Sequence, residues 1–392
     1  MINGVLALPG FNQLLSPETG TLTAADISLI VGLPNIGVIL GLPLATVLGD
    51  NFGRKWSLIV ACLISAVAGA VQTAAFNVAA LIVGRAIANV AIFMFIVLST
   101  TFLAEVAPSS IRGLVVGTSI VLIDFAALVT AGINWGMSTV RGSLSYRLPL
   151  GLQVAFPLFL IIGFLCIDDS PTSYLIKSQD GKAEQCLRSL RKGHDEIEIQ
   201  SELQALKSQS ALRAEEVKIP MTALFHDVNL RRTLLAISVP VMQSMSGIAF
   251  ATNYATIFLK QVGGGSNPYI LTLGLAILAL GGAIAGIFTV DWMGRRTLAL
   301  YSFSIIFFID LGIGILGFFQ HHHPAVHKAI AALSLMFAFF FAAGFGPLAY
   351  IVSSEMPTAR LRNKTNALVF FCVACSNVVV LNILPFISRP DA

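Results

Sequence analysis

Long apolar stretches separated by short polar segments make up most of this chain. Ten of them reach the roughly 17 or more residues that an α-helix needs to cross a bilayer. They cover residues 27–48, 57–75, 80–103, 114–135, 150–168, 232–259, 267–290, 298–319, 328–353 and 365–387. A shorter apolar piece covers residues 1–15. The pattern predicts an all-α membrane protein with about ten complete transmembrane helices.

The composition supports lipid as the solvent of this chain. Only 11% of its 392 residues are charged and the mean hydropathy is +0.83, whereas a soluble domain carries about 25% charged residues. Cys372 and Cys375 lie inside one apolar run, which favours core packing over metal binding. No nucleophile–base pair, metal cluster or separate basic face stands out. We therefore expect neither an enzyme nor a cofactor, metal or nucleic-acid partner.

The segment 169–231 differs sharply from its surroundings, because it holds nearly half of the chain's charged residues. Ile199, Leu203 and Leu206 fall on one helical face, which predicts amphipathic helices. The segment divides the chain into an N-terminal membrane half (1–168), a polar loop and a C-terminal membrane half (232–392). Most Lys and Arg residues then lie on the side of this loop, which predicts that the loop is cytoplasmic.

Two charged signatures recur in the same order, once in each membrane half. One is an Asp followed by a Gly-Arg-Lys or Gly-Arg-Arg turn, and the other is a Glu seven residues before an Arg. The first occurs in Gly49–Lys55 and Val290–Arg296, and the second at Glu105/Arg112 and Glu355/Arg362. This repetition indicates an internal duplication and two pseudo-symmetric helical halves.

Eight ordered pieces of the chain resemble the sugar porter family of the major facilitator superfamily. They are Gly49–Lys55, Gly84-Arg85, Ala104–Pro108 with Arg112-Gly113, Tyr146–Pro149, Asp169–Pro171, Gln243 with Ser246-Gly247, Asp291–Arg296, and Gly346-Pro347 with Glu355. The local sequence features of the chain are most similar to those of fungal hexose and α-glucoside permeases. The resemblance implies the major facilitator fold, which has twelve helices in the family. The ten runs would be helices 2–11, so we expect a chain truncated at both ends, with helix 1 incomplete and the last helix missing.

A cytoplasmic gate is implied by the same resemblance. In the family, charged residues of both signatures form a network that holds the helices together when the pore opens outward. The matching residues here are Asp50, Arg54, Glu105, Arg112, Asp291, Arg295, Arg296, Glu355 and Arg362. Such a network can bias a two-state equilibrium. The alternative is that the basic turns only anchor the topology at the inner leaflet.

A substrate site requires uncharged hydrogen-bonding groups and an aromatic face between the halves. Run 232–259 offers Gln243, Ser246, Asn253 and Tyr254, of which the first two share a helix face. The resemblance adds Tyr350, in place of a family Trp, and Asn377. Interhelical hydrogen bonding is the alternative role for these side chains. Several polar positions of the family pocket are lost here, at Ser244, Ala249, Ala342 and near Ile120.

Proton coupling is the remaining feature that the resemblance implies. Arg85 matches a family Arg that pairs with a helix 1 Asp, and this chain begins just after that Asp. Asp124 is the only acid in the neighbouring run, so it is a candidate proton site or a structural partner.

We therefore expect a multi-pass protein of the plasma membrane that transports a sugar or sugar-like polyol by alternating access, coupled to protons and acting as a monomer. Its partners would be that substrate, protons and the lipid bilayer. One alternative is a transporter of another organic solute, such as a cyclic acid or a secondary metabolite, because the pocket has lost several polar residues. The other is a truncated relative that does not transport.

Overall fold

The structure is a computed structural model that describes residues 2–15, 23–108, 111–140, 142–191, 193, 195–248, 267–319, 324–358 and 361–387. All regular structure in these residues is helical. Within them, nine helical segments are long and apolar enough to cross a membrane. They match nine of the ten predicted runs. The tenth, 232–259, continues beyond the described residues. The prediction of an all-α membrane protein is confirmed.

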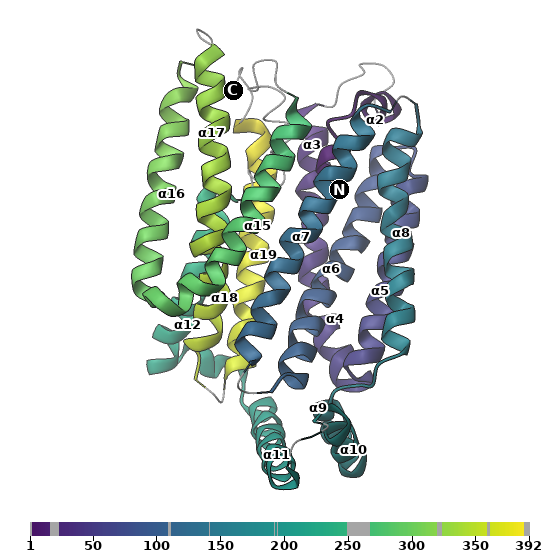
Figure 1. Ribbon diagram of the computed structural model, residues 1–392, viewed down its shortest axis with the longest axis vertical. Coiled ribbons are helices and arrows are strands. Elements are labelled where there is room, and N and C mark those ends of the chain that lie inside the picture. Colours follow the sequence, from purple (N-terminus) through teal and green to yellow (C-terminus); the bar gives the residue numbers. More distant parts are fainter. Residues whose placement is uncertain are drawn as a thin grey trace.

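The helices form two groups that stand side by side (Figure 1). The first group holds α1 (Ile2–Val5), α2 (Pro9–Leu15), α3 (Ala24–Val31), η1 (Leu33–Asn35), α4 (Ile36–Phe52), α5 (Arg54–Ala74), α6 (Val78–Val106), α7 (Arg112–Ser138) and α8 (Leu144–Leu165). The second holds α12 (Asp227–Gln243), η3 (Ser244–Ile248), α15 (Pro268–Met293), α16 (Arg295–Gly317), α17 (Pro324–Phe340), η4 (Phe341–Phe345), α18 (Gly346–Glu355) and α19 (Arg362–Ile387).

Glycines permit close helix packing inside each half. A Cβ atom on Gly41 of α4 would lie 2.7 Å from the carbonyl oxygen of Val90 on α6. A Cβ atom on Gly286 of α15 would lie 3.0 Å from the carbonyl oxygen of Ala343 in η4. Small residues bring backbones this close where apolar side chains give no hydrophobic advantage against lipid.

The two halves meet along two seams. One joins α7 to α15, and the other joins α3 and α4 to α19. At one end of the bundle, an apolar cluster crosses from half to half, because Ile30 and Tyr146 of the first half share it with Tyr269 and Leu381 of the second. We call this end the far end.

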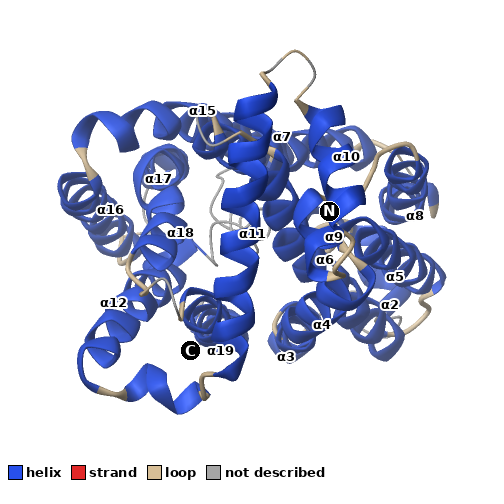
Figure 2. Cartoon of the chain, turned by 90° about the horizontal axis from the view of Figure 1, so that it is seen from below, coloured by secondary structure: helices blue, strands red, loops and turns tan. Residues whose placement is uncertain are grey.

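Three helices outside the bundle occupy the other end, which we call the module end (Figure 1). They are α9 (Pro171–Ile176), α10 (Asp180–Leu190) and α11 (Glu196–Lys218), here called the cap module. Leu175, Leu187, Ile199, Leu203 and Leu206 form its small core. Seen from below, α11 runs along the boundary between the halves (Figure 2).

Candidate gate and substrate site

The turn between α4 and α5 places an arginine inside the protein. Gly53 adopts φ +91°, in the region that favours glycine, and α5 begins at the next residue. The Arg54 side chain is only 2% exposed. A buried guanidinium is costly unless anions and carbonyls surround it.

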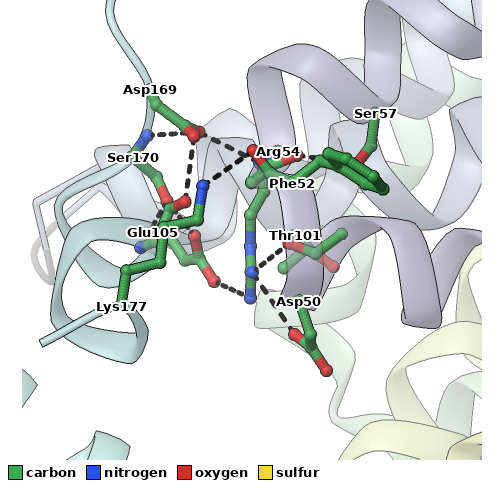
Figure 3. Close-up of polar contacts among 12 residues, drawn as sticks. Asp50, Phe52, Arg54, Ser57, Thr101, Glu105, Asp169, Ser170 and Lys177 are labelled. Atoms are coloured by element: carbon green, nitrogen blue, oxygen red, sulfur yellow. Dashed lines mark hydrogen bonds and ion pairs between the residues drawn. The ribbon is translucent and has the colours of Figure 1, made fainter.

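Two carboxylates and one carbonyl bind the two terminal nitrogens of the Arg54 guanidinium, whereas its buried Nε has no hydrogen-bond partner among the described residues (Figure 3). Its Nη2 lies 3.0 Å from Oε1 of Glu105 on α6, and its Nη1 lies 3.3 Å from Oδ1 of Asp50 on α4. Nη1 also donates to the carbonyl oxygen of Gly49 at 2.8 Å. Glu105 is 12% exposed and also accepts from the hydroxyl of Ser170. Arg54 on α5 thus connects to both α4 and α6, and its contact with Glu105 is largely shielded from solvent.

Asp169 provides a second layer of this network. Its Oδ1 accepts from the backbone N–H groups of Arg54 at 3.0 Å and Lys55 at 3.1 Å, the first two residues of α5. Its Oδ2 accepts from the Ser173 hydroxyl at 2.9 Å. A carboxylate at this position satisfies N–H groups that lack helical partners and complements the helix dipole.

Three cations at the module end reach the final carbonyls of membrane helices. Lys177 donates to Phe52 at 2.8 Å, Arg191 donates to Val106 at 3.0 Å, and Lys55 donates to Leu165 at 3.2 Å. These carbonyls end α4, α6 and α8 respectively. Positive charge at helix C-termini is favourable, so the cap module is electrostatically matched to the N-terminal half.

The second half contains a more exposed version of the gate contact. Arg295, at the start of α16, lies 3.3 Å from Oε1 of Glu355 at the end of α18. Their side chains are 45% and 52% exposed. Arg296 is also exposed. The duplicated motifs therefore bring the same residue types together in both halves, but only the first pair is buried.

Three further gate residues of the sequence analysis are placed only by their backbones. Arg112 begins α7, Asp291 lies in the last turn of α15, and Arg362 begins α19. Their side chains lie outside what the structure describes. Their roles in the gate stay predictions.

Two of the predicted substrate residues, Gln243 and Ser246, lie at a break in the second half. Nε2 of Gln243, the last residue of α12, donates to the carbonyl oxygen of Gly346 at 3.1 Å. The chain then turns out of helical geometry at Ser246 and Gly247, which has φ +84°. The Ser246 hydroxyl donates to the Gln243 carbonyl at 2.8 Å. Gln243 thus ties α12 to the start of α18 next to irregular backbone, which membrane proteins tolerate inside protein or along a cavity.

The remaining substrate candidates are not brought to this point by the described structure. Asn253 and Tyr254 lie outside the described residues. The backbone of Tyr350 belongs to α18, but its side chain is not described, and Asn377 is half-buried on α19. These assignments stay predictions.

The predicted proton-coupling residues lie on separate helices. Arg85 on α6 donates from Nη1 to the carbonyl oxygen of Ile30 at 2.7 Å. Asp124 lies half-buried on α7. Among the described side chains, no ion pair joins these two residues, so the geometry gives the pairing no support.

Several residues in these contacts were not selected from the sequence. Asp169 and Ser170 were noticed only as part of a family motif, although an Asp-Ser-Pro sequence after an apolar run is a typical helix start. Lys177 and Arg191 had no signal that distinguished them from other charges of the loop.

The fold is that of a polytopic membrane protein, and comparison with known proteins identifies its family. The family described as "Sugar (and other) transporter" matches residues 1–389. The chain therefore belongs to the sugar (and other) transporter family, as the resemblance predicted, and family membership agrees with the expectation that it is not an enzyme.

Three curated relatives from fungi are similar to this chain. A probable glucose transporter of Neurospora crassa, rco-3, is 30% identical over 93% of this chain and 63% of its own length. The major facilitator-type transporter ecdD of Aspergillus rugulosus is 27% identical over 93% of this chain and 70% of its own length. The high glucose sensor RGT2 of Saccharomyces cerevisiae is 25% identical over 97% of this chain and 50% of its own length. The chain thus spans between 50% and 70% of the length of these relatives.

Solved structures show the same fold. The proton:xylose symporter XylE bound to 6-bromo-6-deoxy-D-glucose superimposes with a TM-score of 0.78 at 19% identity, over 100% of this chain and 86% of that chain. The inward-open conformation of XylE from E. coli gives a TM-score of 0.77 at 19% identity, over 99% of this chain and 88% of that chain. The chain therefore has the major facilitator fold, as predicted.

Proposed function

We propose that this protein carries a sugar or sugar-like polyol across the plasma membrane by alternating access, coupled to protons. The observation that supports it most directly is the pair of equivalent contacts, Arg54–Glu105 in one half and Arg295–Glu355 in the other. Each contact joins helix ends of one half at the module end, where breaking and re-forming it would alter how that half packs. Family membership and a glucose transporter among the relatives support the substrate class.

The module end lies in the cytoplasm in this proposal. Basic residues at the inner surface retain a loop on that side of the membrane. Single-cysteine variants in the cap module and near residues 50 and 293 should resist a membrane-impermeant maleimide in intact cells and react after permeabilisation. Reaction in intact cells at these positions would reverse the topology.

Transport itself is tested by uptake in yeast cells that lack their own hexose carriers. We expect time-dependent accumulation of a labelled hexose or polyol that is abolished by a protonophore. Accumulation that survives the protonophore would remove proton coupling but keep the carrier function. Equal uptake by cells with and without the protein, across a panel of sugars and polyols, would contradict the substrate class.

A second candidate function is transport of a less polar organic solute. Two features favour it. The resemblance to the family implies that Ser244 and Ala342 stand at polar pocket positions, and the Gln243 amide already donates to the Gly346 carbonyl. A pocket with fewer free donors and acceptors discriminates poorly in favour of polyhydroxylated ligands. Including cyclic acids and secondary metabolites in the same panel separates the two candidates. A relative named as a glucose sensor also makes a non-transporting receptor testable by sugar binding without uptake.

A further inference from the structure

The break between α3 and α4 creates an unusual partner for a membrane arginine. In a regular helix the Ile30 carbonyl would accept from the N–H of residue 34. Residue 34 is Pro34, which has no N–H. Nη1 of Arg85 takes this place and donates to the Ile30 carbonyl at 2.7 Å. The arginine therefore satisfies a carbonyl that the proline has released inside the bundle.

The same short helix contacts the other half of the protein. Oγ of Ser28 donates to the backbone carbonyl of Asn382 on α19 at 3.0 Å and lies 3.2 Å from its Oδ1. A Cβ atom on Gly32 would lie 2.5–2.6 Å from the Asn382 side chain. Ser28 and Gly32 are four residues apart and so share one helix face. We call these contacts the far-end clasp.

Arg85 and the clasp act on one rigid segment. Ile30 lies between Ser28 and Gly32, and it also belongs to the apolar cluster that joins the halves at the far end. Both contacts act on the same turn of α3, so a displacement of that turn would change the Arg85 hydrogen bond and the clasp together. Small helix shifts at an interface are one form of conformational switching, and α3 would be the shifting element here.

We propose that Arg85 is a positioning residue for opening and closing the far end, acting through the Ile30 carbonyl on the Ser28–Asn382 contact. This inference rests on the proposed alternating-access function. It gives Arg85 a task across the boundary between the halves, in addition to any role in proton coupling. The task depends on Pro34, because without the proline the helix would satisfy the Ile30 carbonyl itself.

Cysteine accessibility in purified protein tests the proposal without needing transport. The five native cysteines are replaced by alanine and a reporter, Tyr269→Cys, is placed in the apolar cluster of the far end. Maleimide labelling of the reporter should become about fivefold faster in Ser28→Ala and in Arg85→Met, the effect expected from losing about one hydrogen bond. Arg85→Lys should remain close to the parent protein.

Two combinations distinguish positioning from a general loss of stability. Arg85→Met with Ser28→Ala should label no faster than either variant alone, because both act on one contact. Arg85→Met with Pro34→Ala should return toward the parent rate, because residue 34 then supplies an N–H to the Ile30 carbonyl. Thr118→Ala and Gly132→Ala on α7 serve as controls, since Thr118 bonds only within its helix in the contacts described and nothing lies within 4 Å of a Cβ on Gly132.

Three results would overturn the proposal. The effects of Arg85→Met and Ser28→Ala on the labelling rate could be fully additive in the double variant, or Pro34→Ala could fail to restore slow labelling. Ser28→Ala could also label at the rate of the parent. If Arg85→Met does not purify as a monodisperse species, Gly32→Ala is used in its place in the labelling experiment. It crowds Asn382 at a helical φ of −82° and must speed labelling for the proposal to stand. Loss of uptake with intact labelling behaviour would contradict the proposed function alone.

Discussion

The Oδ2 atom of Asp169 occupies the space that a Cβ atom on Gly53 would need. Gly53 forms the α4–α5 turn, and Asp169, which follows α8, can approach the start of α5 only because residue 53 has no side chain. The glycine at this position therefore does two things. It allows φ +91°, and it admits the carboxylate that holds the first N–H groups of α5.

Gly53→Ala should destabilise the protein more than the equivalent change in the second half. Gly294 has a similar φ of +76°, but nothing lies within 4 Å of its missing Cβ. Gly294→Ala thus reports backbone strain alone, roughly 1–3 kcal/mol. Gly53→Ala adds displacement of Asp169 and should lower the melting temperature in detergent further. Equal melting temperatures for the two variants would show that the Asp169 contact contributes nothing.

Glu105→Gln should disturb the module end far more than Glu355→Gln. Removing one partner of a buried ion pair costs about 3–5 kcal/mol, and Arg54 is 2% exposed. An exposed pair such as Arg295–Glu355 contributes about 0–1 kcal/mol. Thermal unfolding of the two variants measures the difference. A symmetric gate, in which both substitutions have equal effects, would be incompatible with the burial seen here.

The thiol of Cys186 should be almost inert to alkylation near neutral pH. Burial, assisted by the negative charges of Asp168 and Asp169, raises the pKa of Cys186 to about 11. The thiolate is the reactive form, so iodoacetamide at pH 8 should modify exposed Cys166 long before Cys186, as mass spectrometry of peptides can show. Since the folded-state pKa lies above the ordinary 9.0, this thiol favours folding below about pH 9. That contribution is lost as the pH rises toward 11. Equal modification of both cysteines at pH 8 would refute the assignment.

Gln243→Ala should raise the KM for the transported substrate, by about fivefold if one neutral hydrogen bond to the substrate is lost. Initial uptake rates over a range of concentrations give KM and maximal rate separately. Ser238→Ala on the same helix is the matched control, because its hydroxyl bonds to the Leu235 carbonyl within the helix. An unchanged KM and maximal rate for every accepted substrate would show that Gln243 does not contact the substrate. Its amide would then serve only as a hydrogen bond between α12 and α18.

The apolar pattern predicted the fold well because lipid imposes a simple rule on helix length. It could not show where helices break. Pro34 separates α3 from α4, whereas Pro43, Pro149 and Pro157 remain inside continuous helices. The difference arises from partners such as Arg85 and Asn35, whose side chain donates to the Val31 carbonyl at 2.8 Å. Those partners are set by tertiary packing and leave no local signal.

The candidate site was predictable in its residue types and not in its energetics. The duplicated motifs give Arg54 and Arg295 the same preceding Asp and Gly at the same spacing. Their burial differs because Asp169, which lies 115 residues from Arg54, packs against the first turn only. A residue that distant cannot be assigned to the turn from spacing alone.

The cations that bind the final carbonyls of α4, α6 and α8 have one more consequence. Lys177 and Arg191 attach the cap module to helix ends of a single half, whereas Lys55 joins α5 to α8 within that same half. Toward the other half, the structure describes a contact from Lys364 to the carbonyl of Ile219, just after α11. If the halves move past each other as proposed, we expect the module to travel with the first half and to keep its own ion pairs. Ionic strength should accordingly change how long the resting protein survives on storage and leave its turnover number almost untouched.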